Sequence, residues 1–408
     1  MSPRPGKLVI LSWSLYDFAN TIFSMNVISL YFALWVTVDH EGKDILYSAA
    51  LSGSMLAVAL SVPVFGAVSD QTGRRRGPLI LLTLLCVAGT AAIGETDQLG
   101  TGLILFALAN YCYQSSMVFY NGMLPSVARG GNVGLVSGYG VALGYLGSIA
   151  GLVLVRPFVE AGGRSAAFIP TAIMFLFFSL PCFLFVKDPA RESPGRVNLG
   201  QSFKTLWQTL ARTPHYRPLL KFIVIHFLIL DVVHTVIAFM SVYASKVIGF
   251  TDAQITVFLI SSTVAAMVGS FALGWLVKHK GAIWAYWRVL CLWAASLLIA
   301  IMSQSQALFW LVGPLAGMGM GGVWVVSRVF IVELSPPEKV GEFFGVYGLA
   351  GKSASILGPL LWGGVVWVFE DTHTFKYRAA LSALLFITLA AMILFRSLKS
   401  HLTPPRPQ

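Results

Sequence analysis

The residues of this chain that could do chemistry are polar and charged side chains set inside long apolar segments. Asp17 and Asn20 lie in the first apolar segment, and Asp231 and His234 lie in the seventh, three positions apart in each case. A spacing of three places both side chains of a pair on one face of a helix. A carboxyl or imidazole group in such a setting can exchange a proton or bind the charged group of a solute. The sequence therefore predicts proton or solute handling at these four residues.

Two basic residues, Arg328 and Lys352, also lie inside apolar segments. A charge at the bilayer centre costs about 2.5 to 3.5 kcal/mol on insertion scales, so each needs a partner or a wet cavity. A planar guanidinium can hold a carboxylate with two parallel hydrogen bonds, and Asp231 could then take the ammonium group of the same solute. Arg328 also lies 207 positions after Asn121, which makes Asn121 a candidate solute ligand in the other half of the chain.

Each of these residues also has a structural interpretation that the sequence leaves open. Asp17 could contact a cytoplasmic loop near the end of its helix, and His234 could be a neutral, hydrogen-bonded core histidine. Lys352 follows glycines that point at a neighbouring helix, which favours an interhelical ion pair. Arg328 could extend to the membrane surface, or it could neutralise Asp231.

The elements that position these residues are predicted to be transmembrane helices. Hydrophobic residues make up 56% of the chain, charged residues only 11%, and the mean hydropathy is +0.76. Soluble domains carry about 25% charged residues, and about 20 apolar residues span a bilayer as a helix. Twelve such segments occur, approximately at residues 8–37, 49–68, 79–93, 102–119, 135–159, 168–186, 219–243, 255–277, 283–302, 308–332, 343–369 and 379–395.

The basic residues predict the orientation of these segments. With the amino terminus in the cytoplasm, twenty Lys and Arg residues fall in cytoplasmic loops and tails and six fall outside. The positive-inside rule then places both termini in the cytoplasm, and we expect a multi-pass protein of a bacterial inner membrane. The net charge of +11 indicates contact with anionic lipids at the cytoplasmic face, and no nucleic-acid partner is expected.

One long polar break divides the chain. Residues 187–218 are rich in proline and basic side chains, and they separate six apolar segments from the next six. We predict an amino-terminal bundle over residues 1–186, a cytoplasmic linker with an amphipathic helix over 187–218, and a carboxy-terminal bundle and short tail over 219–408.

The two halves carry internal repeats. A polar loop that follows Gly66 returns in eroded form after Gly274, 208 positions later, and the Asp17 pair returns at Asp231 after 214 positions. Three glycines of the fifth segment return in the eleventh after 207 positions: Gly138, Gly144 and Gly151 become Gly345, Gly351 and Gly358. Small residues let membrane helices pack closely. A duplication of this kind is typical of secondary transporters.

The loop between the second and third segments carries glycine, acid and base at regular spacing. Its two glycines permit a tight turn, and we expect Asp70 between them to meet the amino-terminal end of the eleventh helix near Glu342. The arginines are expected to pair with acids such as Glu342 or with lipid phosphates. Contacts of this kind would hold the cytoplasmic side closed in one state. The predicted gating residues are Gly66, Asp70, Gly73, Arg74, Arg75 and Glu342.

These motifs resemble those of the major facilitator superfamily. The loop after Gly66 is similar to the superfamily's loop between helices two and three. Other motifs resemble the branch that contains the fungal vacuolar amino-acid effluxer and its bacterial relatives; they lie at residues 16–20, 120–125, 342–345, 351–353 and 357–360. The resemblance implies a central cavity lined chiefly by helices one, four, seven and ten. His234 and Lys278 depart from the family pattern, which has an amide and an acid at these places.

The expected fold class is therefore an all-α integral membrane protein with twelve transmembrane helices in two pseudo-symmetric six-helix bundles. The resemblance implies transport of a small organic solute by alternating access, most simply the export of an amino acid or a similar zwitterion or anion. The alternatives are a proton-coupled carrier of a sugar, drug or metal chelate, a non-transporting sensor, and a membrane-embedded enzyme. The sequence has no His-Glu-x-x-His pair, nucleophile elbow or Walker loop, so no enzyme activity, catalytic residue, metal or cofactor is predicted. We expect a monomer whose partners are the solute, protons and membrane lipids.

Overall fold

The computed structural model describes residues 6–128, 133–188, 216–335 and 340–402. This part of the chain contains twelve helices that are long and apolar enough to cross a membrane, which confirms the predicted fold class. The chain divides into two compact units, Met1–Phe203 and Lys204–Gln408. The division falls within the predicted linker, whose predicted amphipathic helix lies outside the described residues.

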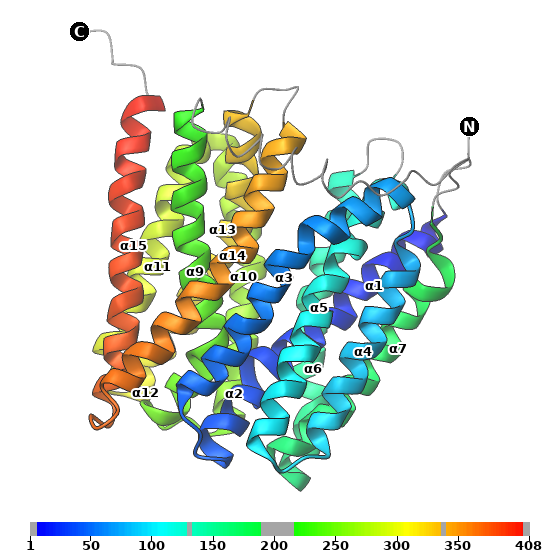
Figure 1. The fold of residues 1–408 in the computed structure, drawn as a ribbon. Helices are drawn as coiled ribbons and strands as arrows, with labels where there is room; N and C mark the ends of the chain where they lie inside the picture. The colour runs from blue at the N-terminus through cyan, green and yellow to red at the C-terminus, as the bar shows by residue number, and fades with distance from the viewer. Residues whose placement is uncertain (1–5, 129–132, 189–215, 336–339, 403–408) are drawn as a thin grey trace, which may run out of the picture. The chain divides into compact units, whose positions relative to one another are not determined.

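The first unit contains the first six spans (Figure 1). Its elements are α1 (Lys7–Phe23), η1 (Ser24–Tyr31), α2 (Phe32–Leu34), η2 (Trp35–Asp39), α3 (Asp44–Thr72), α4 (Arg76–Gly94), α5 (Leu99–Val127), α6 (Val133–Gly162), η3 (Arg164–Ala167) and α7 (Phe168–Phe185). The elements from α1 to η2 follow one another directly and form one span of 33 residues.

The second unit contains the other six spans. Its elements are α9 (Arg217–Lys246), α10 (Asp252–Lys280), α11 (Ala282–Met302), α12 (Gln306–Phe309), α13 (Val312–Leu334), α14 (Val340–Val368) and α15 (Phe375–Leu402). The short helix α12 and helix α13 together make the tenth span.

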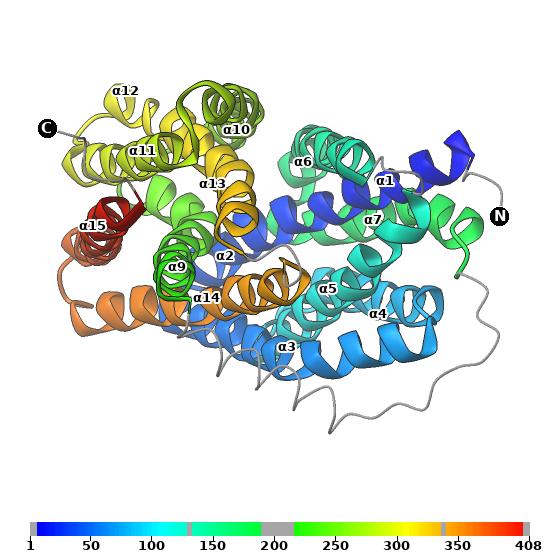
Figure 2. The ribbon, with the colours of Figure 1, turned by 90° about the horizontal axis from the view of Figure 1, so that it is seen from above.

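Within each unit, the first span packs against the fifth. Helix α1 lies against α6 and α7, and α5 lies against α3 and α4 (Figure 2). In the second unit, α9 lies against α14 and α15, while α13 lies against α10 and α11. Four glycines of the predicted repeat, Gly144, Gly151, Gly351 and Gly358, lie where the first and fifth spans of each unit meet, whereas a methyl group added at Gly138 would meet nothing within 4 Å.

Glycines of α13 make a close contact with the backbone of α10 in the second unit. A methyl group added at Gly317 would lie 2.1 Å from the carbonyl oxygen of Ser262, and one added at Gly321 would lie 2.1 Å from that of Ala266. Both carbonyls belong to α10. A spacing of four residues places these glycines on one face of α13, so the backbones of the two helices touch along that face.

The first span is not a regular α-helix. Ser24–Tyr31 and Trp35–Asp39 are π-helical, a form that is rare and occurs mostly as single turns inside α-helices. The carbonyl oxygen of Ile28 accepts a hydrogen bond of 2.8 Å from the hydroxyl of Tyr47. Apolar periodicity predicts an ordinary α-helix for this segment, because it does not distinguish this wider winding.

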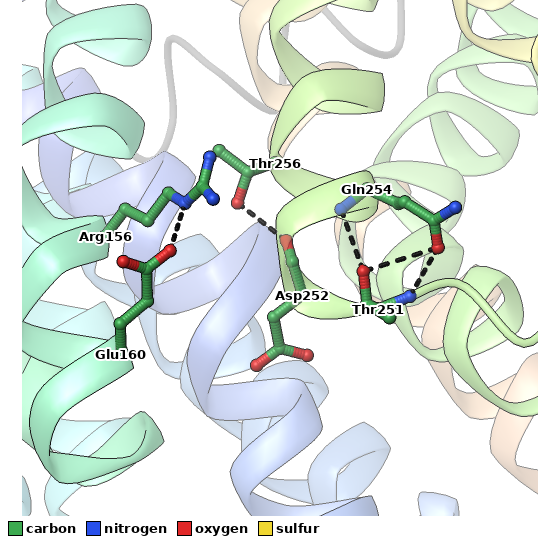
Figure 3. A network of polar contacts seen from close by, with 6 residues as sticks. All are labelled: Arg156, Glu160, Thr251, Asp252, Gln254 and Thr256. Atoms are coloured by element: carbon green, nitrogen blue, oxygen red, sulfur yellow. Dashed lines mark hydrogen bonds and ion pairs between the residues drawn. The ribbon is translucent and has the colours of Figure 1, made fainter.

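Two local contacts stabilise helix ends, one in each unit (Figure 3). In α6, Arg156 Nε donates to Glu160 Oε1 at 2.6 Å, one helical turn apart. At the start of α10, Thr251 and Gln254 form a capping box, in which Thr251 N donates to Gln254 Oε1 at 2.9 Å and Gln254 N donates to Thr251 Oγ1 at 3.3 Å. Such a box satisfies two backbone N–H groups that the helix itself leaves open.

Candidate functional site

Asp17 is the centre of a polar cluster in the first unit. Its Oδ2 accepts a hydrogen bond of 2.8 Å from the hydroxyl of Tyr120 in α5, and its Oδ1 accepts one of 3.2 Å from Asn20 Nδ2. The ring of Tyr120 stacks on Trp13, with 4.5 Å between ring centroids. Asp17 and Asn20 thus share a helix face, as predicted, and Tyr120 of α5 contacts Asp17 from a neighbouring span.

The backbone of α6 makes room for this acid. A methyl group added at Gly140 would lie 2.3 Å from Asp17 Oδ2, and one added at Gly147 would lie 2.2 Å from the carbonyl oxygen of Phe18. Thr21 Oγ1 donates to the carbonyl oxygen of Gly144 at 2.7 Å. The carboxylate of Asp17 therefore lies between α5 and α6, and its position depends on the glycines of α6.

Asp231 joins two helices of the second unit. The side chain is 4% exposed, and its Oδ1 accepts a hydrogen bond of 2.6 Å from the backbone N–H of Gly358 in α14. A methyl group at Gly358 would lie 2.7 Å from the carbonyl oxygen of Asp231 and 2.0 Å from Thr235 Oγ1. The acid therefore bonds to the main chain of its neighbouring helix at the last glycine of the predicted repeat.

His234, Ser355 and Lys352 form a second polar cluster, one helical turn from Asp231. His234 Nδ1 and Ser355 Oγ are 2.6 Å apart, and the ring of His234 is 6.3 Å from that of Trp324 in α13. The ammonium group of Lys352 is close enough to His234 for an electrostatic interaction. Lys352, His234 and Trp324 are each partly exposed although they lie in membrane-spanning helices. An imidazole group of α9 and the ammonium and hydroxyl groups of α14 thus lie close together, with the Trp324 ring of α13 nearby.

Glycine contacts between the first and fifth spans show which residues occupy equivalent positions in the two units, and these pairs differ from the predicted ones. Gly151 of α6 contacts Ile22, and its repeat partner in the second unit, Gly358 of α14, contacts Asp231. Ile22 and Asp231 are 209 positions apart, whereas the sequence comparison had paired Asp17 with Asp231 at 214. By packing, Asp231 is therefore equivalent to Ile22, and the two acids occupy different levels of their spans.

The packing equivalent of Asp17 is His226, 209 positions later. This side chain is completely buried, and its ring stacks on Tyr347 of α14, with 4.5 Å between centroids. Its Nδ1 is 3.4 Å from the hydroxyl of Tyr286, and its Nε2 has no hydrogen-bond partner. Its burial between the rings of Phe222 and Tyr347 agrees with a packing role.

Arg328 and Asn121 lie apart from the two clusters. Both side chains are exposed, on α13 and α5 respectively. Arg328 interacts electrostatically with Tyr347, whose hydroxyl is 2.7 Å from Ser327 Oγ. No contact between Arg328 and Asp231 is found in the described part of the chain.

The predicted gating loop forms a tight turn between α3 and α4. Gly73 ends α3 in the left-handed conformation, with φ of 69°, which glycine adopts without steric cost. Arg75 Nε donates to Ser69 Oγ at 2.9 Å, and the Arg74 side chain is exposed. The side chains of Asp70 and Glu342 lie outside the described residues, so the predicted gate between them stays a prediction.

An acid from the start of the linker holds this loop. Asp188 Oδ1 accepts hydrogen bonds of 2.9 Å from the backbone N–H groups of both Arg75 and Arg76, at the start of α4. The first N–H groups of a helix have no partner within it, and they attract negative charge. Asp188 therefore joins the gating loop of the first unit to the chain that leaves its last span.

Replacing Asp188 by alanine is expected to loosen the start of α4, because two backbone N–H groups lose their acceptor. Loss of a helix cap costs about 1 kcal/mol, which corresponds to roughly fivefold faster hydrogen exchange at the amides of Arg75 and Arg76. Exchange measured by mass spectrometry on a peptide that covers the loop tests this. Asp97→Ala, at an exposed acid after α4, is the matched control and should leave that peptide unchanged. Equal exchange in the wild type and Asp188→Ala would contradict the cap.

Several residues of these clusters were absent from the predicted site. Tyr120 stands in a motif that was recognised only for its family resemblance, next to Asn121. Ser355 lies three positions after Lys352, a helical spacing that could have indicated it. Nothing in the sequence pattern distinguishes Asp188 from any other acid that follows a membrane span.

Comparison with known proteins supports a transporter. The family model described as Major Facilitator Superfamily matches residues 17–359 and 262–408. An MFS-type transporter, YxiO, of Bacillus subtilis is 27% identical over 86% of this chain and 86% of its own length. Autophagy-related protein 22 of Eremothecium gossypii is 23% identical over 90% of this chain and 86% of its own length.

Solved structures share the fold at low sequence identity. Nucleoside transporter NupG superposes with a TM-score of 0.77 at 12% identity, covering 96% of this chain and 99% of its own. A bacterial homologue of the human lysosomal transporter Spinster superposes with a TM-score of 0.76 at 11% identity, covering 97% and 98%. The family match identifies a transporter of small solutes and not an enzyme, and these structures share its fold.

Proposed function

This chain belongs to the major facilitator superfamily, and we propose that it exports an amino acid or a similar small zwitterion by alternating access. The similarity to autophagy-related protein 22 supports the proposal, because the sequence motifs resemble the branch of the fungal vacuolar amino-acid effluxer. The distribution of basic residues supports an orientation with both termini in the cytoplasm.

The observation that carries the proposal is the cluster of Lys352, His234 and Ser355. A lysine inside a membrane-spanning helix is costly, and such residues commonly mark a solute or ion pathway. Ammonium, imidazole and hydroxyl groups can all donate hydrogen bonds to a carboxylate, and charged donors form the strongest of these bonds. The partial exposure of Lys352 and His234 agrees with access for a solute.

The first unit supplies a charge of the opposite sign. Asp17 is partly exposed, and Asn20 and Tyr120 hold its carboxylate by hydrogen bonds. A carboxylate held in this way can accept an ammonium group. Each unit thus offers one charged group as a proposed ligand for a solute group of opposite charge. Arg328 and Asn121, both exposed, remain proposed solute ligands.

Proton coupling is proposed at the same acids. Asp17 and Asp231 are carboxylates in the interior of spans one and seven, and His234 is one turn from Asp231. A carboxyl that binds a proton in one state of the cycle and releases it in the other can couple solute movement to a pH gradient. The rival is facilitated diffusion, in which the solute's own gradient drives transport.

The test is solute flux in liposomes that contain the purified protein. Vesicles preloaded with a mixture of amino acids should lose selected ones faster than protein-free vesicles, and a pH gradient should change the rate. Selective loss of amino acids at a rate that does not depend on the pH gradient would support transport and exclude proton coupling. If neither amino acids nor sugars move while the protein remains folded, the transport proposal fails and a sensor is favoured.

A further inference from the structure

Two arginines of the second unit lie over tryptophan rings of one helix. Arg288 Cζ is 4.4 Å from the ring centroid of Trp284, and both residues belong to α11. Arg396 Cζ, from α15, is 5.1 Å from the ring centroid of Trp287, also on α11. Both guanidinium groups are exposed. Stacking on an indole fixes the plane of a guanidinium and leaves the N–H groups at its edge available as donors.

The two guanidinium groups lie over neighbouring rings, because Trp284 and Trp287 are three positions apart on one face of α11. Each interacts electrostatically with Cys291, which is partly exposed and lies one turn after Trp287 on α11. Helices α11 and α15 pack together, and the Trp287 ring is 6.4 Å from Phe395 of α15. Within the described part of the chain, neither arginine forms an ion pair. The result is a pair of stacked cations at the groove between two helices.

The location of this arginine pair indicates an anionic lipid and not a soluble anion. Arg288 lies six residues from the start of α11, which is about 9 Å along the helix from the predicted cytoplasmic loop. Tryptophan and arginine at that depth lie at the level of phospholipid headgroups. Leu298 of α11, three turns beyond Trp287, and Ile393 of α15, three residues before Arg396, are 48% and 67% exposed. These apolar side chains give the same two helices an exposed apolar surface for acyl chains within the membrane.

We propose that the groove between α11 and α15 binds one anionic glycerophospholipid. Its phosphodiester oxygens accept hydrogen bonds from Arg288 and Arg396, and its acyl chains lie along Leu298 and Ile393. The geometry suits a phosphate because a guanidinium edge presents two parallel N–H groups. Such a lipid would fasten the last span of the second unit to α11 at the cytoplasmic surface.

The experiment compares lipid retention by the full-length protein in native mass spectrometry. Phosphatidylglycerol is offered to the wild type, Arg288→Gln, Arg396→Gln and the double variant, with phosphatidylcholine as the neutral lipid. Each basic residue near an anionic surface contributes about fivefold in affinity, so the double variant should retain roughly thirtyfold less phosphatidylglycerol. Retention of phosphatidylcholine should be the same in all variants.

Lys221→Gln is the matched control. Lys221 lies in the first turns of α9, and its ammonium group is already bonded to Ser397 Oγ of α15. Its removal deletes one positive charge near the same end of α15 without touching the arginine pair, so phosphatidylglycerol retention should stay at the wild-type level. An equal loss in Lys221→Gln and the arginine variants would overturn the site in favour of diffuse attraction, as would full retention by the double variant. Equal thermal stabilisation by inorganic phosphate and by phosphatidylglycerol would also overturn it, because the ligand would then not be a lipid.

Discussion

Lys352→Gln is expected to abolish concentrative transport of the amino-acid substrate while the purified protein stays folded. The carboxylate of the solute would lose its only cationic partner in the cluster with His234 and Ser355, since glutamine donates a hydrogen bond without a charge. Hydrogen bonds to charged groups contribute about 1.5 to 3 kcal/mol, which corresponds to a roughly 10- to 150-fold loss of affinity. Substrate-induced thermal stabilisation and uptake in liposomes measure the two effects.

Three comparisons separate solute binding from a structural role of Lys352. Lys246→Gln, an exposed lysine in the last turn of α9, makes the same change away from the cluster and should leave uptake intact. Lys352→Arg keeps the charge and should recover part of the affinity. The carboxamide analogue of the substrate should bind the wild type and Lys352→Gln equally. A folded Lys352→Gln protein that binds the carboxylate substrate with unchanged affinity would exclude the proposed ligand.

Gly317→Ala is expected to destabilise the second unit severely. The added methyl group would lie 2.1 Å from the backbone carbonyl oxygen of Ser262, and this contact can be relieved only by moving α13 away from α10. Overpacking of a well-packed interior costs about 1 to 3 kcal/mol, and a collision with backbone belongs at or above the upper end of that range. Thermal unfolding in detergent should show a lowered midpoint and a reduced yield of monodisperse protein.

Gly53→Ala in α3 is the control with the opposite expected sign. A methyl group at Gly53 meets nothing within 4 Å, so only the backbone preference changes. Alanine is favoured over glycine inside a helix by about 1 kcal/mol, and this variant should be as stable as the wild type or more so. If Gly317→Ala unfolds at the same temperature as Gly53→Ala, the close contact between α10 and α13 is wrong.

The spans could be predicted from the sequence because membrane insertion depends on the length and hydropathy of a segment. An apolar run of about 20 residues has few structural options in a bilayer, since every backbone group must find its partner within the helix. The helix face shared by Asp17 and Asn20 follows from local geometry in the same way. These properties need no knowledge of neighbouring helices.

The register between helices could not be predicted, because it depends on contacts between distant parts of the chain. Aligning Asp17 with Asp231 matched residue types, whereas the packing matches Ile22 with Asp231 through the glycines that each contacts. The π-helical residues Ser24–Tyr31 were equally hidden, because apolar composition does not distinguish π from α winding. The hydrogen bonds of Asp188 to the start of α4 join residues 112 and 113 positions apart, and no local pattern encodes them.

Neither Asp17 nor Asp231 has an acid at the equivalent position of the other unit. The position equivalent to Asp17 holds His226, and the position equivalent to Asp231 holds Ile22. The two carboxyls would therefore bind protons as separate sites and not as a symmetric pair. With one proton per solute molecule and no membrane potential, a difference of one pH unit across the membrane could sustain at most a tenfold difference in solute concentration, because both correspond to about 1.4 kcal/mol. A pH difference alone would therefore drive such a carrier only against shallow solute gradients.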